Sequence, residues 1–302
     1  MFSMCVINIL AGLVLSPLFM GIITRVKAVF AGRKGQPLLQ LYYDLYKLAC
    51  KGAVYSRTTT WLFKAGPVVS MAAVFAVLFL VPAGAQGSVF TFTGDLILFA
   101  YLLGLARFFT VLAAMDTGSS FEGMGASREV RFAVLAEPTL FLALAALMRI
   151  TGALSLSGIY ANLGSGAWVV AAPALILVSG ALLIVMLAEN SRVPVDDPNT
   201  HLELTMIHEV MVLDHSGPDL ALILYGASIK LWVLASLLVG LFSGVLGHLF
   251  PGTLAFIFGM FAVAVLIGAI ESVMARMRMV RVPQLLLIAL SFSTLALIFS
   301  MR

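Results

Sequence analysis

The sequence predicts an all-α, polytopic integral membrane protein with about eight transmembrane helices. Of its 302 residues, 62% are hydrophobic and only 11% are charged, and the mean hydropathy is +1.09. A water-soluble domain typically carries about 25% charged residues, so the solvent of this chain is lipid. The apolar stretches run to about 20 residues without alternation, which favours helices over the short alternating strands of a membrane barrel.

Residues 1–302 are predicted to form a single membrane domain. The apolar N-terminal stretch lacks a basic n-region and an obvious cleavage site, so it is predicted to stay as the first span. The predicted spans are Phe2–Ile23, Gly66–Val81, Leu96–Met115, Val130–Met148, Ala167–Ala188, Leu220–Phe242, Thr253–Met274 and Gln284–Met301.

Lysine and arginine residues gather in alternate loops. Eight lie in the first long loop, two follow the third span, one follows the fifth and three follow the seventh, whereas the opposite side holds Arg149 and Arg302. The positive-inside rule therefore predicts outward-facing termini in the cell inner membrane. It explains the net charge of +4 without nucleic acid as a partner. The predicted cytoplasmic loops are residues 24–65, 116–130, 189–219 and 275–283.

The first cytoplasmic loop contains an amphipathic segment. On a helix, its side chains would separate into an apolar stripe and a polar stripe. The apolar stripe comprises Leu38, Leu41, Tyr42, Leu45, Leu48 and Ala49, and the polar stripe comprises Gln40, Asp44, Lys47 and Lys51. Such a helix suits the headgroup plane of a bilayer, and it also suits contact with a soluble partner.

Three ionisable residues fall deep inside predicted spans. Glu137 lies about 9 Å from the inner edge, Arg107 lies about 13 Å inside its span, and Lys230 lies about 15 Å inside, near the midplane. A charge at mid-bilayer costs at least about 2.5–3.5 kcal/mol, and such groups often mark ion pathways. The alternative is a static ion pair, for instance between Glu137 and Arg107, that only fixes helix register. Pro138 favours the pathway, because it removes a helix hydrogen bond beside Glu137.

The loop at residues 189–219 is unusually acidic for the positive side of a membrane protein. Apolar residues are interleaved with its acids, which favours a partly buried acidic funnel over a solvated surface. The funnel would contain Glu189, Asp196, Glu203 and Asp214, with Arg192 as the single cation of the loop. Histidines recur every seven residues at His201, His208 and His215, a spacing of about 10 Å on a helix that is too long for one metal ion. Proton exchange near neutral pH suits any of the three.

The sequence contains no motif for covalent chemistry. It lacks a P-loop, a dinucleotide-binding glycine pattern, a nucleophile elbow and a Cys-x-x-Cys pair, and Cys5 and Cys50 follow no ligand spacing. We therefore expect a chain that binds no metal or cofactor and is not catalytic by itself.

The acidic loop also carries a resemblance. AENSRVPVDDPNTHLEL resembles the signature loop of the membrane subunit 1 family of respiratory complex I, and DHSG at residues 214–217 is similar to the E-Y-S-G of that family. The resemblance covers essentially the whole chain, including the long basic first loop. The matching residues are Glu189, Arg192, Pro194, Asp196, Pro198 and Glu203.

Two other segments resemble one branch of that family, the membrane anchors of [NiFe] hydrogenase and formate hydrogenlyase complexes. DTGSSFEGMGASREVRFAVLAEP at residues 116–138 matches the branch pattern at Asp116, Arg128, Glu129 and Glu137. RKGQPLLQLYYDLYKL in the first loop keeps Gln40, Tyr43, Asp44 and Lys47. Asn199 and His201 stand where the quinone-reducing branch usually has acids, which speaks against a typical quinone site.

The resemblance implies a non-catalytic subunit that anchors a peripheral electron-transfer arm and couples its redox chemistry to proton or sodium movement. The implied partners are a [NiFe] hydrogenase-like large subunit, a small iron–sulfur subunit, a ferredoxin-like subunit and antiporter-like membrane subunits. Iron–sulfur clusters and NiFe would belong to those partners, and quinone is an allowed ligand. The rival hypotheses are a quinone-binding subunit of an NADH:quinone oxidoreductase, a stand-alone ion transporter and a purely structural anchor.

On this view the candidate residues divide into two sets. The ion path or coupling set is Glu137, Glu189, Arg192, Asp196, Glu203, Asp214, Arg107, Arg128 and Lys230. The partner-docking set is Gln40, Tyr43, Asp44, Lys47, Asp116 and Glu129.

Overall fold

A computed structural model describes residues 2–84, 86–196, 206–246 and 252–301. Those residues form α-helices and two short 3-10 helices, with no strand among them. The α-helices are α1 (Phe2–Phe30), α2 (Gln40–Ala49), α3 (Trp61–Leu80), α4 (Asp95–Asp116), α5 (Ser120–Thr151), α6 (Leu156–Asn162), α7 (Ser165–Glu189), α8 (Gly217–Leu246), α9 (Gly252–Val273) and α10 (Val282–Phe299). The 3-10 helices are η1 (Glu209–Val212) and η2 (Met279–Arg281).

Eight of the described helices are long and apolar enough to cross a membrane, which confirms the predicted fold class. They are α1, α3, α4, α5, α7, α8, α9 and α10, the last extended by η2. The chain is therefore a multi-pass membrane protein. Two predicted boundaries need correction. The first span continues to Phe30, and the loop predicted at residues 116–130 is reduced to residues 117–119, because α5 already begins at Ser120.

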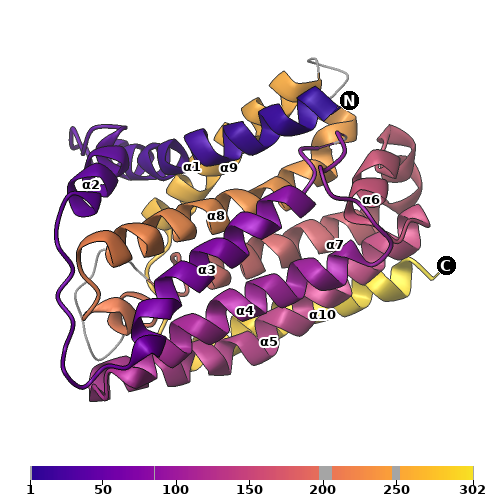
Figure 1. The fold of residues 1–302 in the computed structure, drawn as a ribbon. Helices are drawn as coiled ribbons and strands as arrows, with labels where there is room; N and C mark the ends of the chain where they lie inside the picture. The colour runs from indigo at the N-terminus through magenta and orange to yellow at the C-terminus, as the bar shows by residue number, and fades with distance from the viewer. Residues whose placement is uncertain (1, 85, 197–205, 247–251, 302) are drawn as a thin grey trace.

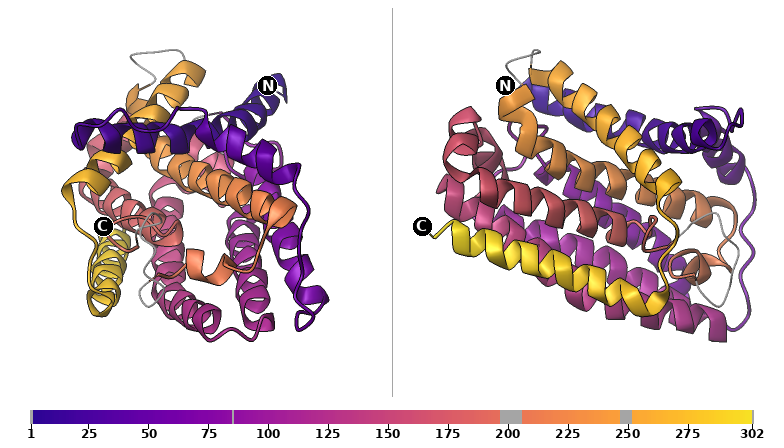
Figure 2. Two further views of the ribbon diagram at one scale, coloured as in Figure 1. Left: turned by 90° about the vertical axis from the view of Figure 1, so that its left-hand side faces the viewer. Right: turned by 180° about the vertical axis from the view of Figure 1, so that it is seen from behind.

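The long helices lie side by side in one bundle (Figure 1). Their main packing partners are α3 with α4, α10 with α5 and α7, and α1 with α9. The two termini lie at the end of the bundle that carries α6, and α2 lies at the opposite end (Figures 1 and 2). An even number of spans requires this arrangement, since each crossing reverses the direction of the chain.

Helix α8 forms much of the interior of the bundle. It packs against α1, α3, α7 and α9, and 67% of its most apolar window is buried within the protein. Gly240 permits this packing, because a Cβ atom there would lie 2.5 Å from the ring of Tyr160. The Tyr160 hydroxyl donates to the Leu237 carbonyl at 2.9 Å. Small residues that let helices approach closely are typical of membrane bundles.

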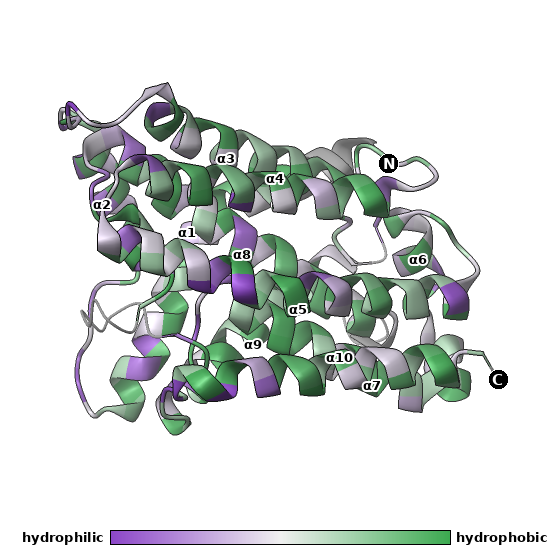
Figure 3. Cartoon of the chain, turned by 90° about the horizontal axis from the view of Figure 1, so that it is seen from below, coloured by the Kyte–Doolittle hydropathy of each residue, from purple (hydrophilic) through white to green (hydrophobic). Residues whose placement is uncertain are grey.

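The predicted amphipathic helix is present as α2. It packs against α8 and α1, and none of its side chains is fully buried. The Tyr42 hydroxyl donates to the Val14 carbonyl of α1, which holds the apolar stripe against the bundle. Hydrophilic segments gather toward the α2 end of the protein, whereas apolar colour predominates along the spans (Figure 3). Polar positions that remain inside the bundle mark the site described next.

Candidate functional site

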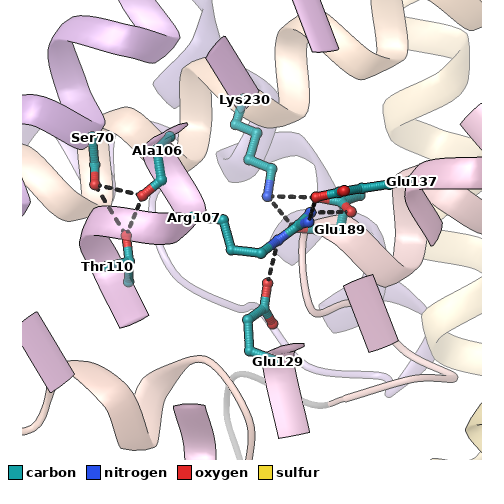
Figure 4. Close-up of polar contacts among 8 residues, drawn as sticks. All are labelled: Ser70, Ala106, Arg107, Thr110, Glu129, Glu137, Glu189 and Lys230. Carbon is teal, nitrogen blue, oxygen red and sulfur yellow. Dashed lines mark hydrogen bonds and ion pairs between the residues drawn. The ribbon is translucent and has the colours of Figure 1, made fainter. Parts of the chain in front are cut away.

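Five charged side chains meet inside the bundle, and we call them the Arg107 cluster. Its members are Arg107, Glu129, Glu137, Glu189 and Lys230. The Arg107 guanidinium donates to all three carboxylates, with 3.2 Å between Nε and Glu129 Oε1 (Figure 4). Lys230 Nζ lies 2.9 Å from Glu189 Oε2. The cluster therefore joins α4, α5, α7 and α8 through one shared arginine.

Helix geometry explains why these residues converge. Glu129 and Glu137 are eight residues apart on α5, so both lie on one face about 12 Å apart, and Arg107 on α4 reaches between them. Glu189 is the last residue of α7, where backbone carbonyls lack helical partners. Lys230 donates to the Glu189 carbonyl at 2.7 Å, and a cation at a helix C-terminus is electrostatically favourable.

The cluster contains one more carboxylate than cations. Arg107, Glu129 and Glu189 have side chains that are 8%, 13% and 7% exposed, so water screens their charges only weakly. A buried ion pair is costly to form and is tolerated only when each charge has close partners. With three carboxylates and two cations, one carboxylate has to share its cation, which favours proton uptake at this position.

A cavity of about 80 Å³ adjoins the cluster. Its polar wall includes Arg107, Glu129, Glu189, Lys230 and Arg192, and methionine and leucine side chains complete it. A buried water needs roughly 10–15 Å³ of such space and two to four polar partners, so the cavity suits several water molecules. The arrangement offers a protonatable, hydrated centre within the membrane bundle.

His208 also lines this cavity, from the segment before η1. Burial lowers the pKa of its imidazole, while Glu129, Asp196 and Glu189 act in the opposite direction. Burial dominates, so His208 is neutral near pH 7 and can accept or donate a hydrogen bond there. The expectation of proton exchange at this histidine stays a prediction.

A second group of charges, which we call the Glu271 cluster, consists of Lys27, Arg192 and Glu271. Glu271 Oε2 lies 2.9 Å from Lys27 Nζ, and Glu271 Oε1 lies 3.2 Å from the Arg192 guanidinium. The Glu271 side chain is completely buried. The cluster ties α1 and α9 to the segment that follows α7.

Asp196 strengthens the same connection. It pairs with Arg276 at 2.7 Å and accepts a hydrogen bond from the backbone of Ile207 at 2.9 Å. The backbone of Met277 donates to the Pro194 carbonyl at 2.9 Å. Arg192 and Asp196, both assigned to ion coupling from sequence, thus hold the loop in place, and Arg192 also reaches the cavity wall.

The predicted acidic set is not gathered into one funnel. Glu189 belongs to the Arg107 cluster and Asp196 to the Arg276 pair. The side chain of Asp214 is exposed, and its backbone N–H donates to the buried Glu122 at 3.1 Å. Glu203 lies outside the described residues. The funnel was expected because the acids are close in sequence, but each acid is placed by a different neighbouring helix.

The docking residues also separate. In α2, Gln40 donates to Asp44 at 2.9 Å, while Tyr43 and Lys47 are exposed. Asp116 instead accepts from the backbone of Thr60 at 2.6 Å and so holds the start of α3. These positions leave α2 as the exposed part of the predicted docking set.

Two further assignments change in the folded chain. Glu129, predicted for docking, is a member of the Arg107 cluster. Arg128 donates to the Met206 carbonyl at 2.8 Å and anchors the segment that leads to η1. The static pair between Arg107 and Glu137 considered from sequence is present, but it is one of three contacts made by the same guanidinium.

Sequence reasoning missed Glu271 and Glu122. Both side chains are buried, and Glu271 holds two cations. Glu271 lies inside the predicted span Thr253–Met274, so a carboxylate at that depth was a signal that could have been used. Glu122 gave no such signal, because it fell within a predicted loop.

Comparison with known proteins identifies the class of this chain. The profile of a family described as NADH dehydrogenase matches residues 2–301. The chain belongs to this family, as the signature loops predicted.

Individual relatives refine the comparison. Hydrogenase-4 component C of Escherichia coli (strain K12) is 35% identical over 233 residues, which cover 76% of this chain and 71% of that protein. Formate hydrogenlyase subunit 4 of the same strain is 29% identical over 94% of this chain and 93% of its own length. A membrane relative from the NADH-quinone oxidoreductase of Burkholderia vietnamiensis (strain G4 / LMG 22486) is 28% identical over 68% of this chain and 60% of that protein.

A solved structure shares the fold. A chain of the membrane-bound sulfane sulfur reductase, an archaeal respiratory membrane complex, aligns with a TM-score of 0.78. The alignment covers 98% of this chain and 99% of that chain, at 21% sequence identity. The bundle architecture is therefore common to this family member and to a respiratory complex.

Proposed function

We propose that this chain is the membrane-anchoring and ion-coupling subunit of a complex I-related oxidoreductase of the hydrogenase or formate hydrogenlyase type. The observation that carries the proposal is Arg107, whose single guanidinium is shared by three carboxylates beside a water-sized cavity. The hydrogenase-4 and formate hydrogenlyase relatives support the choice of complex. The electron-carrying partners, the cell inner membrane and the outward termini belong to the same proposal.

The chemistry follows from the shared guanidinium. When Glu129 or Glu189 takes up a proton, its attraction for Arg107 weakens, and Arg107 binds the remaining carboxylates more strongly. A negative charge that arrives in a partner subunit near the inner loops favours this proton uptake. The proton can then leave through another carboxylate of the cluster once the charge has moved on. Redox change outside this chain is thereby linked to proton movement within it.

Quinone, the alternative ligand, fits the cavity poorly. Sites for ligands of that class usually measure about 300–1,000 Å³, whereas this cavity measures about 80 Å³. Its polar wall presents Arg107, Lys230, Glu129 and Glu189, which suits water better than an apolar ring. We therefore derive no step through quinone.

The test is the Glu189→Gln variant in the assembled complex. Sealed inverted membrane vesicles report electron transfer by product formation and ion movement by a pH-sensitive or sodium-sensitive dye. We expect electron transfer to persist and ion movement to fall to the level of uncoupled vesicles, since glutamine cannot release a proton.

Asp214→Asn provides the matched control, because Asp214 lies in the same acidic loop with an exposed side chain. It is expected to retain both activities. Full ion movement in Glu189→Gln would overturn the coupling role. Ion flux by the purified chain alone in liposomes would select the stand-alone transporter instead.

A further inference from the structure

One member of the Arg107 cluster differs from the others in exposure. The Glu137 side chain is 48% exposed, whereas that of its partner Arg107 is 8% exposed. Glu137 lies near the middle of α5, far from both helix ends. The exposed carboxylate therefore faces the lipid side of the bundle at membrane depth, where an ionised group without a polar neighbour is costly.

Glu137 opens into a groove between α4 and α5 with a volume of about 430 Å³. Ala100 and Gly104 belong to its lining, and the aromatic side chains of Tyr101, Phe108 and Phe141 flank it. Tyr101 and Phe108 are 71% and 57% exposed. The groove is thus an apolar trough with one carboxylate, and it shares Gly104 and Glu137 with a smaller cavity that reaches Glu189.

We propose that this groove binds a transmembrane helix of a second membrane subunit, which presents a hydrogen-bond donor to Glu137. Charge complementarity carries the choice of occupant. Acyl chains contain no donor for a carboxylate, whereas a lysine, histidine, serine or threonine on a neighbouring helix supplies one. A helix also matches the shape of the trough, whose small side chains permit a close approach.

A second copy of this chain fits less well. A two-fold symmetric contact would bring the same patch from both copies together. The Glu137 carboxylates would then face each other, and like charges in a medium of low dielectric constant repel strongly. A different chain with a complementary donor avoids this repulsion.

The inference rests on the proposed membership of a multisubunit membrane complex, but it does not depend on ion coupling. The direct test places the photo-reactive residue p-benzoylphenylalanine at Tyr101 in the complete complex within native membranes. Phe258 on α9 is the matched aromatic control, because it is 58% exposed and α9 packs mainly against α1 and α8. Mass spectrometry of the irradiated complex identifies the cross-linked peptides.

We expect position 101 to cross-link to a membrane-spanning peptide of a different, co-purifying subunit with a donor side chain within about one helical turn of the adduct. Position 258 should not capture that peptide. Adducts of position 101 with lipid alone, with this chain itself, or with a soluble subunit would each overturn the inference.

Gly104→Leu supplies an independent variant. A Cβ atom at Gly104 would meet only Glu137 Oε1, at 4.0 Å, so the fold of this chain tolerates the change while the groove is filled. We expect the cross-link from position 101 to fall by about tenfold or more, with the peripheral arm still bound, and Gly104→Ala to have a smaller effect. An undiminished cross-link in Gly104→Leu would contradict the proposal.

The two proposals fail separately. Normal ion movement in Glu189→Gln together with the expected cross-link would sink the coupling role and leave the docking surface. Loss of ion movement in Glu189→Gln without a helix cross-link at position 101 would do the reverse.

Discussion

The Arg107 cluster and the Glu271 cluster are built from the same side-chain types, yet their surroundings differ. The Arg107 cluster has three carboxylates and two cations, and it borders a cavity and an open groove. The Glu271 cluster has one completely buried carboxylate between two cations. The difference teaches that access to water and to alternative partners, rather than charge alone, separates a protonatable centre from a structural clamp.

The largest effect is expected from Glu271→Leu. Removing the carboxylate leaves Lys27 and Arg192 without this partner, and breaking a buried ion pair costs about 3–5 kcal/mol. The loop after α7 should detach from α9, so little folded protein should reach the membrane. Fluorescence-detected size-exclusion chromatography of a tagged chain measures this loss. A monodisperse Glu271→Leu chain at wild-type yield would show that the clamp is dispensable.

A smaller loss of stability but a larger loss of coupling is expected from Arg107→Lys. Lysine is a compact point charge and cannot bridge three carboxylates as the planar guanidinium does. The carboxylates that lose their partner can be hydrated from the cavity or take up a proton, which limits the destabilisation. Ion movement per electron should fall about tenfold or more, while electron transfer persists. Wild-type coupling in this variant would place the Arg107 cluster with the clamps.

The smallest effect is a dependence of stability on pH that arises at the cavity. Burial lowers the pKa of His208, so the folded chain binds this proton less readily than the unfolded chain. Stability is therefore complete above the unfolded pKa of about 6.5, and it falls as the pH drops below that value, by at most about 1.4 kcal/mol per unit. Thermal denaturation in detergent at pH 7.5 and 5.5 measures the loss.

His208→Gln isolates that contribution. The variant should lose less stability on acidification than the wild type, because glutamine does not titrate. His215 remains as a second buried histidine with a lowered pKa, stacked on Phe63 with 3.9 Å between ring centroids, so some pH dependence should persist. An unchanged pH dependence in His208→Gln would assign the whole effect to other groups.

Much of the fold could be predicted because each span carries its own signal. A run of apolar residues reports its lipid environment without reference to any other helix, and the stripe in α2 reports its interface in the same way. The boundary near Ser120 could not be predicted, because α5 extends beyond the membrane with polar turns that resemble a loop.

The candidate site was predicted only in part. Arg107, Glu137 and Lys230 were recognisable because a charge inside an apolar run is conspicuous wherever it points. Glu129 and Glu271 were misplaced or missed because their roles depend on which helix faces them. Sequence proximity also suggested that Asp196 and Asp214 act together, although they lie with different partners.

The sequence by itself determined that this chain is a helical membrane protein, which family signature it carries, and which charges lie deep in its spans. Those properties are local, since the cost of burying an apolar or charged residue in lipid belongs to that residue alone. Only the tertiary structure decided that three carboxylates from two helices share Arg107, that Glu271 clamps the loop after α7, and that Glu137 faces outward. Such contacts depend on the rotation and packing of several helices at once, and no single segment encodes them.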